Sequence, residues 1–277
     1  MRDGIVAGTV AIPEGAIGAA LLAAAAVAAL VAPFLLPGDP LAIAGRPLLA
    51  PFTDARVPLG TDRLGRDILA GVVHGARASL VVGLAVAAVA LAIGAALGAL
   101  AGYLGGVLDE VVMRIADAVQ TVPSFLLALA FVSVFGPSLP ALVAALAISA
   151  WTAPARIVRA EAMSLRLHSY VEASRLIGRP SIAIACLVVL PNAVRPAIAL
   201  AAVIVAGAIL SESALAFLGL GDPNRASWGA MIAEGRSVLR TAPHVIVAPG
   251  LALLATVLAV SLLGEAFARR LAGQRSG

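Results

Sequence analysis

The residue types that most often carry out chemistry are scarce in this sequence, and one of them is missing. All 19 basic residues are arginine, because the 277 residues include no lysine. A phosphate-binding loop of the GxxxxGK type needs a lysine that reaches the nucleotide phosphates, and Schiff-base catalysis needs a lysine amine. The sequence therefore excludes a P-loop nucleotide site and Schiff-base chemistry in this chain.

Histidine and cysteine offer no replacement chemistry. His74, His168 and His244 are too scattered along the sequence to suggest a metal site. Cys186 is the single cysteine, so no disulfide can form within the chain. We therefore expect neither a catalytic nor a metal-binding residue.

The composition is that of a membrane protein. Apolar residues make up 61% of the chain and charged residues 12%, and the mean hydropathy is +1.05. A soluble domain of this size needs more charge on its surface, so the composition excludes an ordinary soluble enzyme, a disordered protein and a disulfide scaffold. The arginines form no dense basic stripe, so we expect no nucleic-acid partner.

Six apolar segments are long enough to be membrane helices, since a bilayer core needs about 20 apolar residues per helical crossing. They lack the short alternating pattern of a membrane barrel. The sequence predicts an all-α, polytopic membrane protein with about six transmembrane helices. The segments are 17–36, 79–101, 115–135, 139–157, 192–211 and 245–265.

Six crossings place both chain ends on one side of the membrane, together with the polar segment 158–191. Eleven of the 19 arginines fall on that side, which favours the cytoplasm. The first segment, 17–36, is longer than a signal-peptide core and follows no excess of positive charge. We interpret it as a retained helix, with a cleaved signal peptide as the alternative.

Segment 158–191 has the signals of a short, shaped helix. Ser169 and Glu172 have capping-box spacing, which predicts a helix start. Gly178 can end that helix in the left-handed conformation, and Pro180 can begin the next. A simple connection needs only a few residues. The segment either merely joins two spans or is a knob that enters a groove on a soluble partner.

Glu172-Ala173-Ser174, then Gly178 and Leu190-Pro191, resembles the EAA motif of ATP-binding-cassette (ABC) importer permeases. In that family the short helix before the glycine is the coupling helix, which docks into a cleft of an ATPase subunit. The resemblance implies that Glu172 is a polar contact or cap in docking and that Gly178 sets the corner. The ATPase-coupling residues it implies are Glu172, Ala173, Ser174, Gly178 and Pro191.

The resemblance runs from about residue 58 to the C-terminus. Residues 58–80, 214–236 and 248–267 look like the dipeptide, oligopeptide and nickel branch of the family, most of all its DppC/OppC-type second permease. The implied fold is that of type I ABC importer permeases. Two features depart from the family pattern: Ser174 replaces the second alanine of the motif, and SIAIACLVVL follows Pro180 where relatives usually carry basic or aromatic residues.

The resemblance also implies partners and a place in the cell. It implies a multi-pass protein of the bacterial inner membrane that forms half of a path for di- or oligopeptides and is not itself an enzyme. ATP and magnesium would be bound by one or two DppD/DppF-like ATPase subunits, so this chain would hold no cofactor. A second, DppB/OppB-like permease and an extracytoplasmic solute-binding protein would complete the transporter.

Two polar segments that are expected outside the membrane, residues 58–68 and 219–236, imply a second contact surface. By resemblance, they meet the solute-binding protein; alternatively, Trp228 is an interfacial anchor and the charges belong to a solvated loop. The candidate contact residues are Asp62, Arg66, Asp67, Asp222, Trp228 and Glu234.

Polar residues in or beside apolar segments are candidates for the transport path. Asp117 and Gln120 either line that path or pair within their helix or at the interface, and Glu212 is either a gate or a cap. Arg156 and Arg159 are expected to anchor a helix among lipid headgroups.

Four glycines at a spacing of four predict a close helix contact in the second span. They are Gly94, Gly98, Gly102 and Gly106.

We divide the chain into three parts: 1–78, with the first span and an external segment; 79–267, the permease domain with coupling loop 158–191; and 268–277, a short tail. Three rival functions stay open. They are a permease for nickel or another small solute, a secondary transporter, and a purely structural membrane subunit. Near-absence of acidic residues from the middle of the spans counts against a secondary transporter.

Overall fold

The computed structural model describes residues 14–273, without the side chains of 270–273, and this part of the chain is helical with no β-strand. The prediction of an all-α protein is therefore confirmed. The N-terminal half contains α1 (Glu14–Leu35), α2 (Ile68–Leu104), α3 (Gly106–Thr121), α4 (Ser124–Phe135), α5 (Leu139–Ala150) and α6 (Thr152–Leu165). The C-terminal half contains α7 (Ser169–Leu176), α8 (Ser181–Ile184), α9 (Leu190–Ala193), α10 (Arg195–Ile198), α11 (Ala201–Phe217), α12 (Trp228–Gly235) and α13 (His244–Gly273).

The described helices supply up to six membrane crossings. Four are long, apolar and continuous: α1, α2, Arg195–Phe217 and α13. The other two are broken, because α3 and α4 meet at 85° and α5 and α6 at 42°. The spans expected over 115–135 and 139–157 are therefore each formed by two helices with a bend between them. The length and mean apolarity that predict a span do not give the angle of such a bend.

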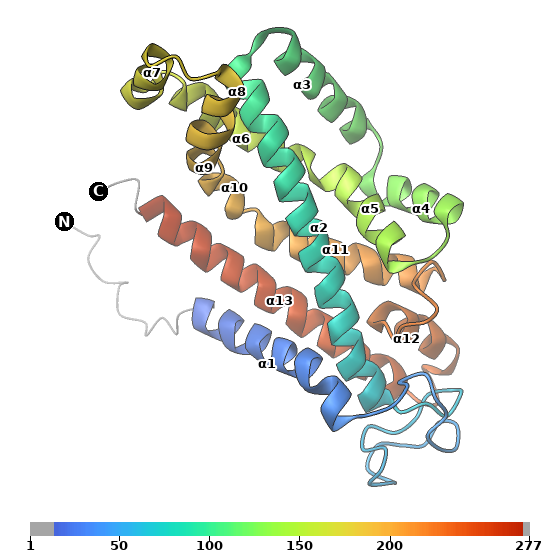
Figure 1. Ribbon diagram of the computed structural model, residues 1–277. Coiled ribbons are helices and arrows are strands. Elements are labelled where there is room, and N and C mark those ends of the chain that lie inside the picture. Colours follow the sequence, from blue (N-terminus) through green and yellow to red (C-terminus); the bar gives the residue numbers. More distant parts are fainter. Residues whose placement is uncertain (1–13, 274–277) are drawn as a thin grey trace, which may run out of the picture.

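The central helix is α2, which contacts most of the others (Figure 1). Its glycine stripe lies against α6: a Cβ on Gly94 would come within 2.5 Å of the Trp151 carbonyl oxygen, and one on Gly98 would overlap the Ala155 carbonyl. Gly102 meets α6 in the same way. The predicted close contact is confirmed for these three glycines. It is wrong for Gly106, which starts α3 with open space around it.

The first and last spans lie side by side (Figure 1). Glu14 at the start of α1 pairs with Arg269 near the end of α13, with 2.9 Å between Oε2 and Nη2. The start of the first span and the end of the last are therefore at the same end of the bundle. The last helix extends beyond the predicted 245–265, so residues 268–273 of the predicted tail are helical, and 274–277 lie outside the described residues.

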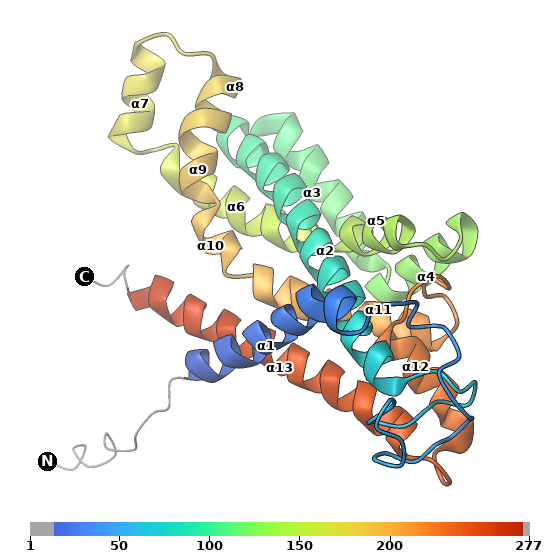
Figure 2. The same cartoon turned by 60° about the horizontal axis from the view of Figure 1, so that its bottom comes forward.

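The polar segments gather at opposite ends of the bundle. Figure 2 shows α7 and α8 at one end, with the start of α1 and the end of α13 toward that side, and α12 with the loop before α2 at the other. Between α8 and α9 the helix widens into a π-helical turn, Ala185–Val189. Pro191 follows this turn and has no N–H to donate to the preceding turn.

Candidate functional site

The short helix α7 starts differently from the prediction. Its N-cap residue is His168, with extended backbone, and Ser169 is the first helical residue. No side chain caps the helix start, so the predicted Ser169–Glu172 capping box is wrong. The backbone entered the helix one residue earlier than the spacing suggested, and Glu172 is left exposed in the first turn.

The end of α7 follows the prediction. Gly178 has φ +77°, its N–H donates to the Arg175 carbonyl, and the Arg179 N–H donates to the Ser174 carbonyl, at 2.9 and 3.3 Å. These two bonds make a Schellman motif, which reverses the chain and satisfies the last carbonyls of the helix. Pro180 then takes the N-cap position of α8. Gly178 therefore sets the corner between α7 and α8.

Two side chains anchor α7 to the bundle. Val171 is fully buried among residues of α2, α6 and α8. Arg175 donates from Nε to the Tyr103 hydroxyl at 3.0 Å, and its guanidinium lies 5.1 Å from the centre of the Tyr103 ring. Since Tyr103 is in the last turn of α2, these contacts join α7 to the end of the central span.

The outer side of α7 is an exposed, mixed surface. Glu172 and Ala173 are exposed, as are Leu176 and Ile177, with 84% and 71% of their surface accessible. The Ser174 hydroxyl donates to the Tyr170 carbonyl at 2.9 Å, so this departure from the alanine pattern is satisfied within the helix. Large apolar side chains on so small a helix suit a protein partner. Pro191 is exposed in α9, outside α7.

At the other end of the bundle, residues 58–68 and residues 219–236 come together. Asp62 accepts backbone N–H bonds from Leu64 and Arg66, both at 2.8 Å, and shapes the turn before α2. Asp67 caps α2 by accepting from the Leu69 N–H at 2.8 Å. Both predicted contact residues therefore hold backbone structure.

Trp228 is buried, with 1% of its surface accessible. Its Nε1 donates to the Val72 carbonyl at 2.9 Å, and its ring packs where Gly75 leaves room. The expectation that Trp228 contacts a binding protein or anchors at the lipid interface is wrong for its side chain. Neither segment alone reveals this burial, because it requires both to meet. Trp228 instead fixes α12 to α2.

A charged cavity of about 270 Å³ lies between these two segments, lined by residues that include Arg66, Asp222 and Glu234. Arg66 Nη1 lies 3.4 Å from Glu234 Oε1 and links the loop to α12. Burial raises the pKa of the Glu234 carboxyl, and the charge of Arg66 opposes that rise. Asp222 pairs with Arg225 at 3.5 Å.

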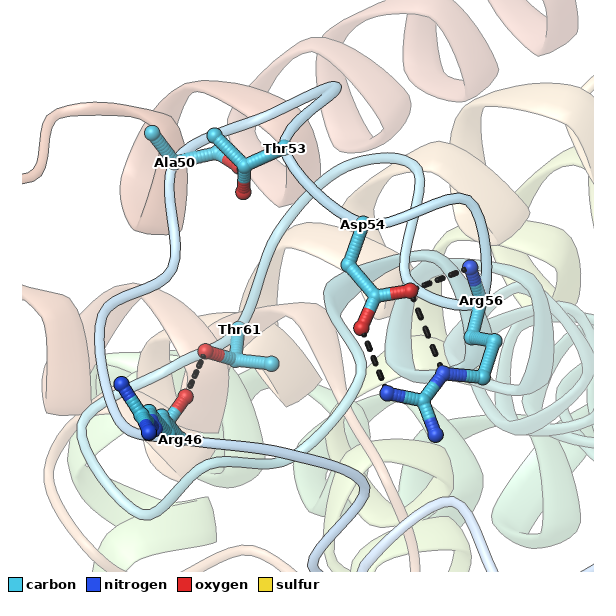
Figure 3. A network of polar contacts seen from close by, with 6 residues as sticks. All are labelled: Arg46, Ala50, Thr53, Asp54, Arg56 and Thr61. Atoms are coloured by element: carbon cyan, nitrogen blue, oxygen red, sulfur yellow. Dashed lines mark hydrogen bonds and ion pairs between the residues drawn. The ribbon is translucent and has the colours of Figure 1, made fainter.

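The loop 46–61 has its own polar contacts (Figure 3). Thr61 donates to the Arg46 carbonyl at 2.5 Å, and hydrogen bonds from Arg56 lower the pKa of Asp54 to about 2. In the same loop, Phe52 has φ +64° and 86% of its surface exposed. The sequence gives no sign of this strained, exposed aromatic residue, because only the backbone angles reveal the strain.

A polar ladder joins α3 and α6. Asp117 Oδ1 lies 2.6 Å from Arg156 Nη2, and Gln120 donates to the Thr152 hydroxyl at 2.8 Å. Arg159 pairs with Asp109 nearer the α7 end. The ladder consists of these three contacts, Asp109–Arg159, Asp117–Arg156 and Gln120–Thr152.

The ladder gives these charged residues partners on neighbouring helices. Arg156 and Arg159, which are expected to anchor a helix among lipid headgroups, each pair with a carboxylate of α3. Asp117, expected either to line the path or to pair within its helix or at the interface, pairs with Arg156 on α6. The Glu110–Arg114 pair within α3 also forms, at 3.6 Å.

Glu212 is 3% exposed and accepts hydrogen bonds from the Ser79 and Ser213 hydroxyls, both at 3.3 Å. Its side chain lies between α2 and α11, so in this conformation it lines no open path. The hydrogen bonds from Ser79 and Ser213 give this buried carboxylate a role in the contact between α2 and α11, whereas the sequence indicated only a gate or a cap.

The sequence matches the model of a known protein family. A family model described as the inner membrane component of binding-protein-dependent transport systems matches residues 94–273. That range includes the ladder, α7 and α12.

Curated proteins are similar over most of the chain. A probable peptide ABC transporter permease from Sinorhizobium fredii is 42% identical over 255 residues, which cover 90% of this chain and 85% of that protein. The di/tripeptide transport system permease DppC of Pseudomonas aeruginosa is 40% identical over 259 residues, 91% and 86% of the two chains. The glutathione transport system permease GsiD of Shigella flexneri is 42% identical over 207 residues, 74% and 68%.

Proposed function

Since the chain belongs to the family of inner membrane components of binding-protein-dependent transport systems, it is a permease subunit of an ABC importer, and we propose that it transports peptides. Such a subunit forms part of the path and carries out no covalent chemistry. Peptide transport is supported by the names of the relatives, which transport peptides, di- and tripeptides or glutathione.

Coupling to ATP hydrolysis takes place at α7. The observation that carries this proposal is a short helix that is rigidly tied to α2 through Val171 and Arg175 while its tip stays exposed. An ATPase cleft that closes on Leu176 and Ile177 can pull α7 and move α2 with it. Transport is then a change between two states driven by differential contacts.

The coupling residues have separate roles. Glu172 supplies a polar contact on the docking face, and Ala173 keeps that face flat. Ser174 and Gly178 hold the end of the helix, and Pro191 stiffens the segment that returns to the membrane. ATP and magnesium are bound by the ATPase subunits, and this chain supplies no ligand to either.

The opposite end receives the solute-binding protein. Arg66, Asp222 and Glu234 are accessible there and line the charged cavity, and Phe52 projects from the loop beside it. Asp62, Asp67 and Trp228 act indirectly, because they shape the loop and hold α12. A second permease completes the path.

The orientation follows from these two ends. We place α7 and both chain ends in the cytoplasm of a bacterial cell and the loop 37–67 with α12 outside its inner membrane. The Glu14–Arg269 pair supports a common side for the two ends, and the excess of arginine supports the cytoplasm.

Co-purification of the tagged chain from its own membranes tests coupling. We expect an ABC ATPase to co-purify, and Leu176→Asp with Ile177→Asp to remove it. Leu64→Asp is the matched control, because Leu64 is an exposed leucine at the opposite end. Retention of the ATPase by the double variant would contradict docking at α7.

Uptake tests the substrate. Cells that lack the gene should lose accumulation of labelled di- and tripeptides and regain it with the gene restored, and only while the ATPase is active. Accumulation of nickel instead of peptides would contradict the proposed substrate class and leave the proposed coupling to the ATPase intact. Accumulation against a gradient without any ATPase would overturn both.

A further inference from the structure

A hollow lies at the place where both broken spans bend. It has a volume of about 240 Å³ and lies between α2, α4, α5 and α11. Three serines from three different helices line it, Ser124 on α4, Ser149 on α5 and Ser211 on α11, together with Gly207 on α11. We call this space the serine hollow.

The hydroxyls of the serine hollow have unused hydrogen-bonding capacity. The hydroxyls of Ser124 and Ser211 form no hydrogen bond with any residue in the described part of the chain, and the Ser149 hydroxyl donates to the Leu146 carbonyl at 3.1 Å. Lipid offers these hydroxyls no hydrogen-bond partner, which disfavours their burial in hydrocarbon. Water or a polar solute can pair them.

The backbone beside the hollow points to the same occupant. The chain between α3 and α4 leaves the helix at Val122 and Pro123, and residues 121–124 are exposed. Non-helical backbone at membrane depth is tolerated only where protein buries it or where it lines a water-filled cavity. The described residues 14–273 do not bury the break, so this backbone meets either a partner subunit or water, and the hydroxyls of the serines favour water.

The serine hollow continues the polar ladder between α3 and α6. Gln120–Thr152 lies just across the two helix breaks from Ser124 and Ser149, and the Thr152 hydroxyl donates to the Ser149 carbonyl at 3.0 Å. Asp117–Arg156 follows along α3 and α6 toward the α7 end. Polar groups thus extend from the hollow along one pair of helices. In lipid such a series is disfavoured, whereas along an aqueous path it is expected.

We propose that the serine hollow is this chain's wall of a hydrated transport path, where Ser124, Ser149 and Ser211 exchange hydrogen bonds with the amide groups of the passing solute. The inference rests on the proposed function and adds the residues of the path. Hydroxyls both donate and accept and carry no charge. They match the peptide bond, which peptides of every sequence share, and leave the choice of side chain to other parts of the transporter.

Thiol labelling of the assembled transporter tests hydration. Ser149→Cys and Ser211→Cys are treated with 2-(trimethylammonium)ethyl methanethiosulfonate, which reacts with thiolates in water. Leu254→Cys on α13 is the matched control, with 54% of the leucine exposed on an apolar helix. The unmodified chain, with Cys186 alone, gives the background. We expect the two serine positions to react at least tenfold faster than position 254 in the nucleotide-free or the vanadate-trapped complex.

Equal rates at all three positions in both states would overturn the inference. Slower labelling when the loaded binding protein and a di- and tripeptide mixture are added would support the inference and the peptide proposal together. Fast labelling that peptides do not change, in a transporter that accumulates another solute, would support the hydrated path and overturn the peptide proposal.

Gly207 provides a second, independent test. A Cβ on Gly207 or on Gly250 would meet no atom within 4 Å, so both positions accept a side chain. Gly207→Leu should fill the hollow and lower uptake at least tenfold while the partner subunits still co-purify, and Gly250→Leu should leave uptake within twofold. Loss of the partner permease from the Gly207→Leu complex would identify the face as a subunit interface and overturn the inference.

Discussion

Asp117 and Arg156 form an ion pair across two broken spans, with 2.6 Å between Oδ1 and Nη2, although 39 residues separate them in the sequence. Both side chains keep much of their surface exposed, 63% for Asp117 and 43% for Arg156. Lipid solvates such a pair poorly. This face of the α3–α6 pair therefore meets water or a protein partner in the assembled transporter.

Exchange of the two charges tests the pair. Asp117→Asn and Arg156→Gln should each destabilise the protein, and Asp117→Arg with Arg156→Asp should recover part of the loss. Because both groups are partly exposed, we expect a coupling of about 0.5–1 kcal/mol in a double-mutant cycle of thermal unfolding. The Glu110–Arg114 pair is a control, since it is more exposed and lies within one helix. Zero coupling at 117–156 would contradict a stabilising role.

Gly178 is tested by residues that differ in their tolerance of positive φ. Gly178→Val should lower uptake and ATPase co-purification strongly, since φ +77° costs a β-branched residue about 1–3 kcal/mol. Gly178→Asn should retain most of both, because asparagine enters the left-handed region more easily. Wild-type uptake by the valine variant would count against a coupling role for this corner.

Alanine substitutions at two helical glycines should have different effects on the free energy of unfolding. Gly98→Ala should destabilise the protein by about 1–3 kcal/mol, because its Cβ overlaps the Ala155 backbone of α6. Gly250→Ala should be neutral or stabilising by up to about 1 kcal/mol, because its surroundings are open. Unfolding midpoints of the purified protein check both, and equal effects would show that the α2–α6 contact does not depend on the stripe.

Phe52 should contribute to contact with the binding protein. Phe52→Ala removes an exposed aromatic side chain and breaks no buried contact, so the unfolding midpoint should hardly change. Stimulation of the ATPase by loaded binding protein should require several-fold more of that protein. Ile43→Ala is the matched control, because Ile43 is also exposed in the segment 37–67 before α2. Equal stimulation curves for wild type and Phe52→Ala would exclude Phe52 from the contact.

Glu234 should make stability depend on pH. Burial raises the pKa of its carboxyl above the ordinary 4.5, so folding favours the protonated form. This contribution is fully present below the unfolded pKa and is lost as pH rises through the folded pKa. Relative to Glu234→Gln, which does not titrate there, wild type should gain stability as pH falls from about 7 to about 4. A constant or opposite difference in unfolding midpoint would contradict the raised pKa.

Local signals were sufficient at several positions. Long apolar segments indicated the spans, because a helix in lipid needs only length and apolarity. Gly178 was identifiable because a helix end that turns sharply requires a residue tolerant of positive φ. Gly94, Gly98 and Gly102 indicated a close contact through their spacing, although not its partner, α6.

Other features depended on segments that are distant in the sequence. Trp228 was expected to contact a binding protein or to anchor at the lipid interface, and its burial depends on Val72 and Gly75 of α2. Glu212 was expected to be a gate or a cap, and its contact with Ser79 also depends on α2. The break at Val122–Pro123 had a local signal, since a proline inside a helical pattern ends or kinks the helix, but the 85° angle between α3 and α4 depends on the packing of both helices.

The sequence by itself determined an all-helical membrane protein and the corner at Gly178, because hydrophobic length and helix-end chemistry depend on neighbouring residues. The family was indicated by the resemblance of its motifs to those of ABC importer permeases, which needs no tertiary structure. Only the tertiary structure decided which polar side chains are buried and which face a common space. Burial and pairing are properties of two surfaces together, and the chain brings Ser124, Ser149 and Ser211 to one hollow only when α4, α5 and α11 have packed.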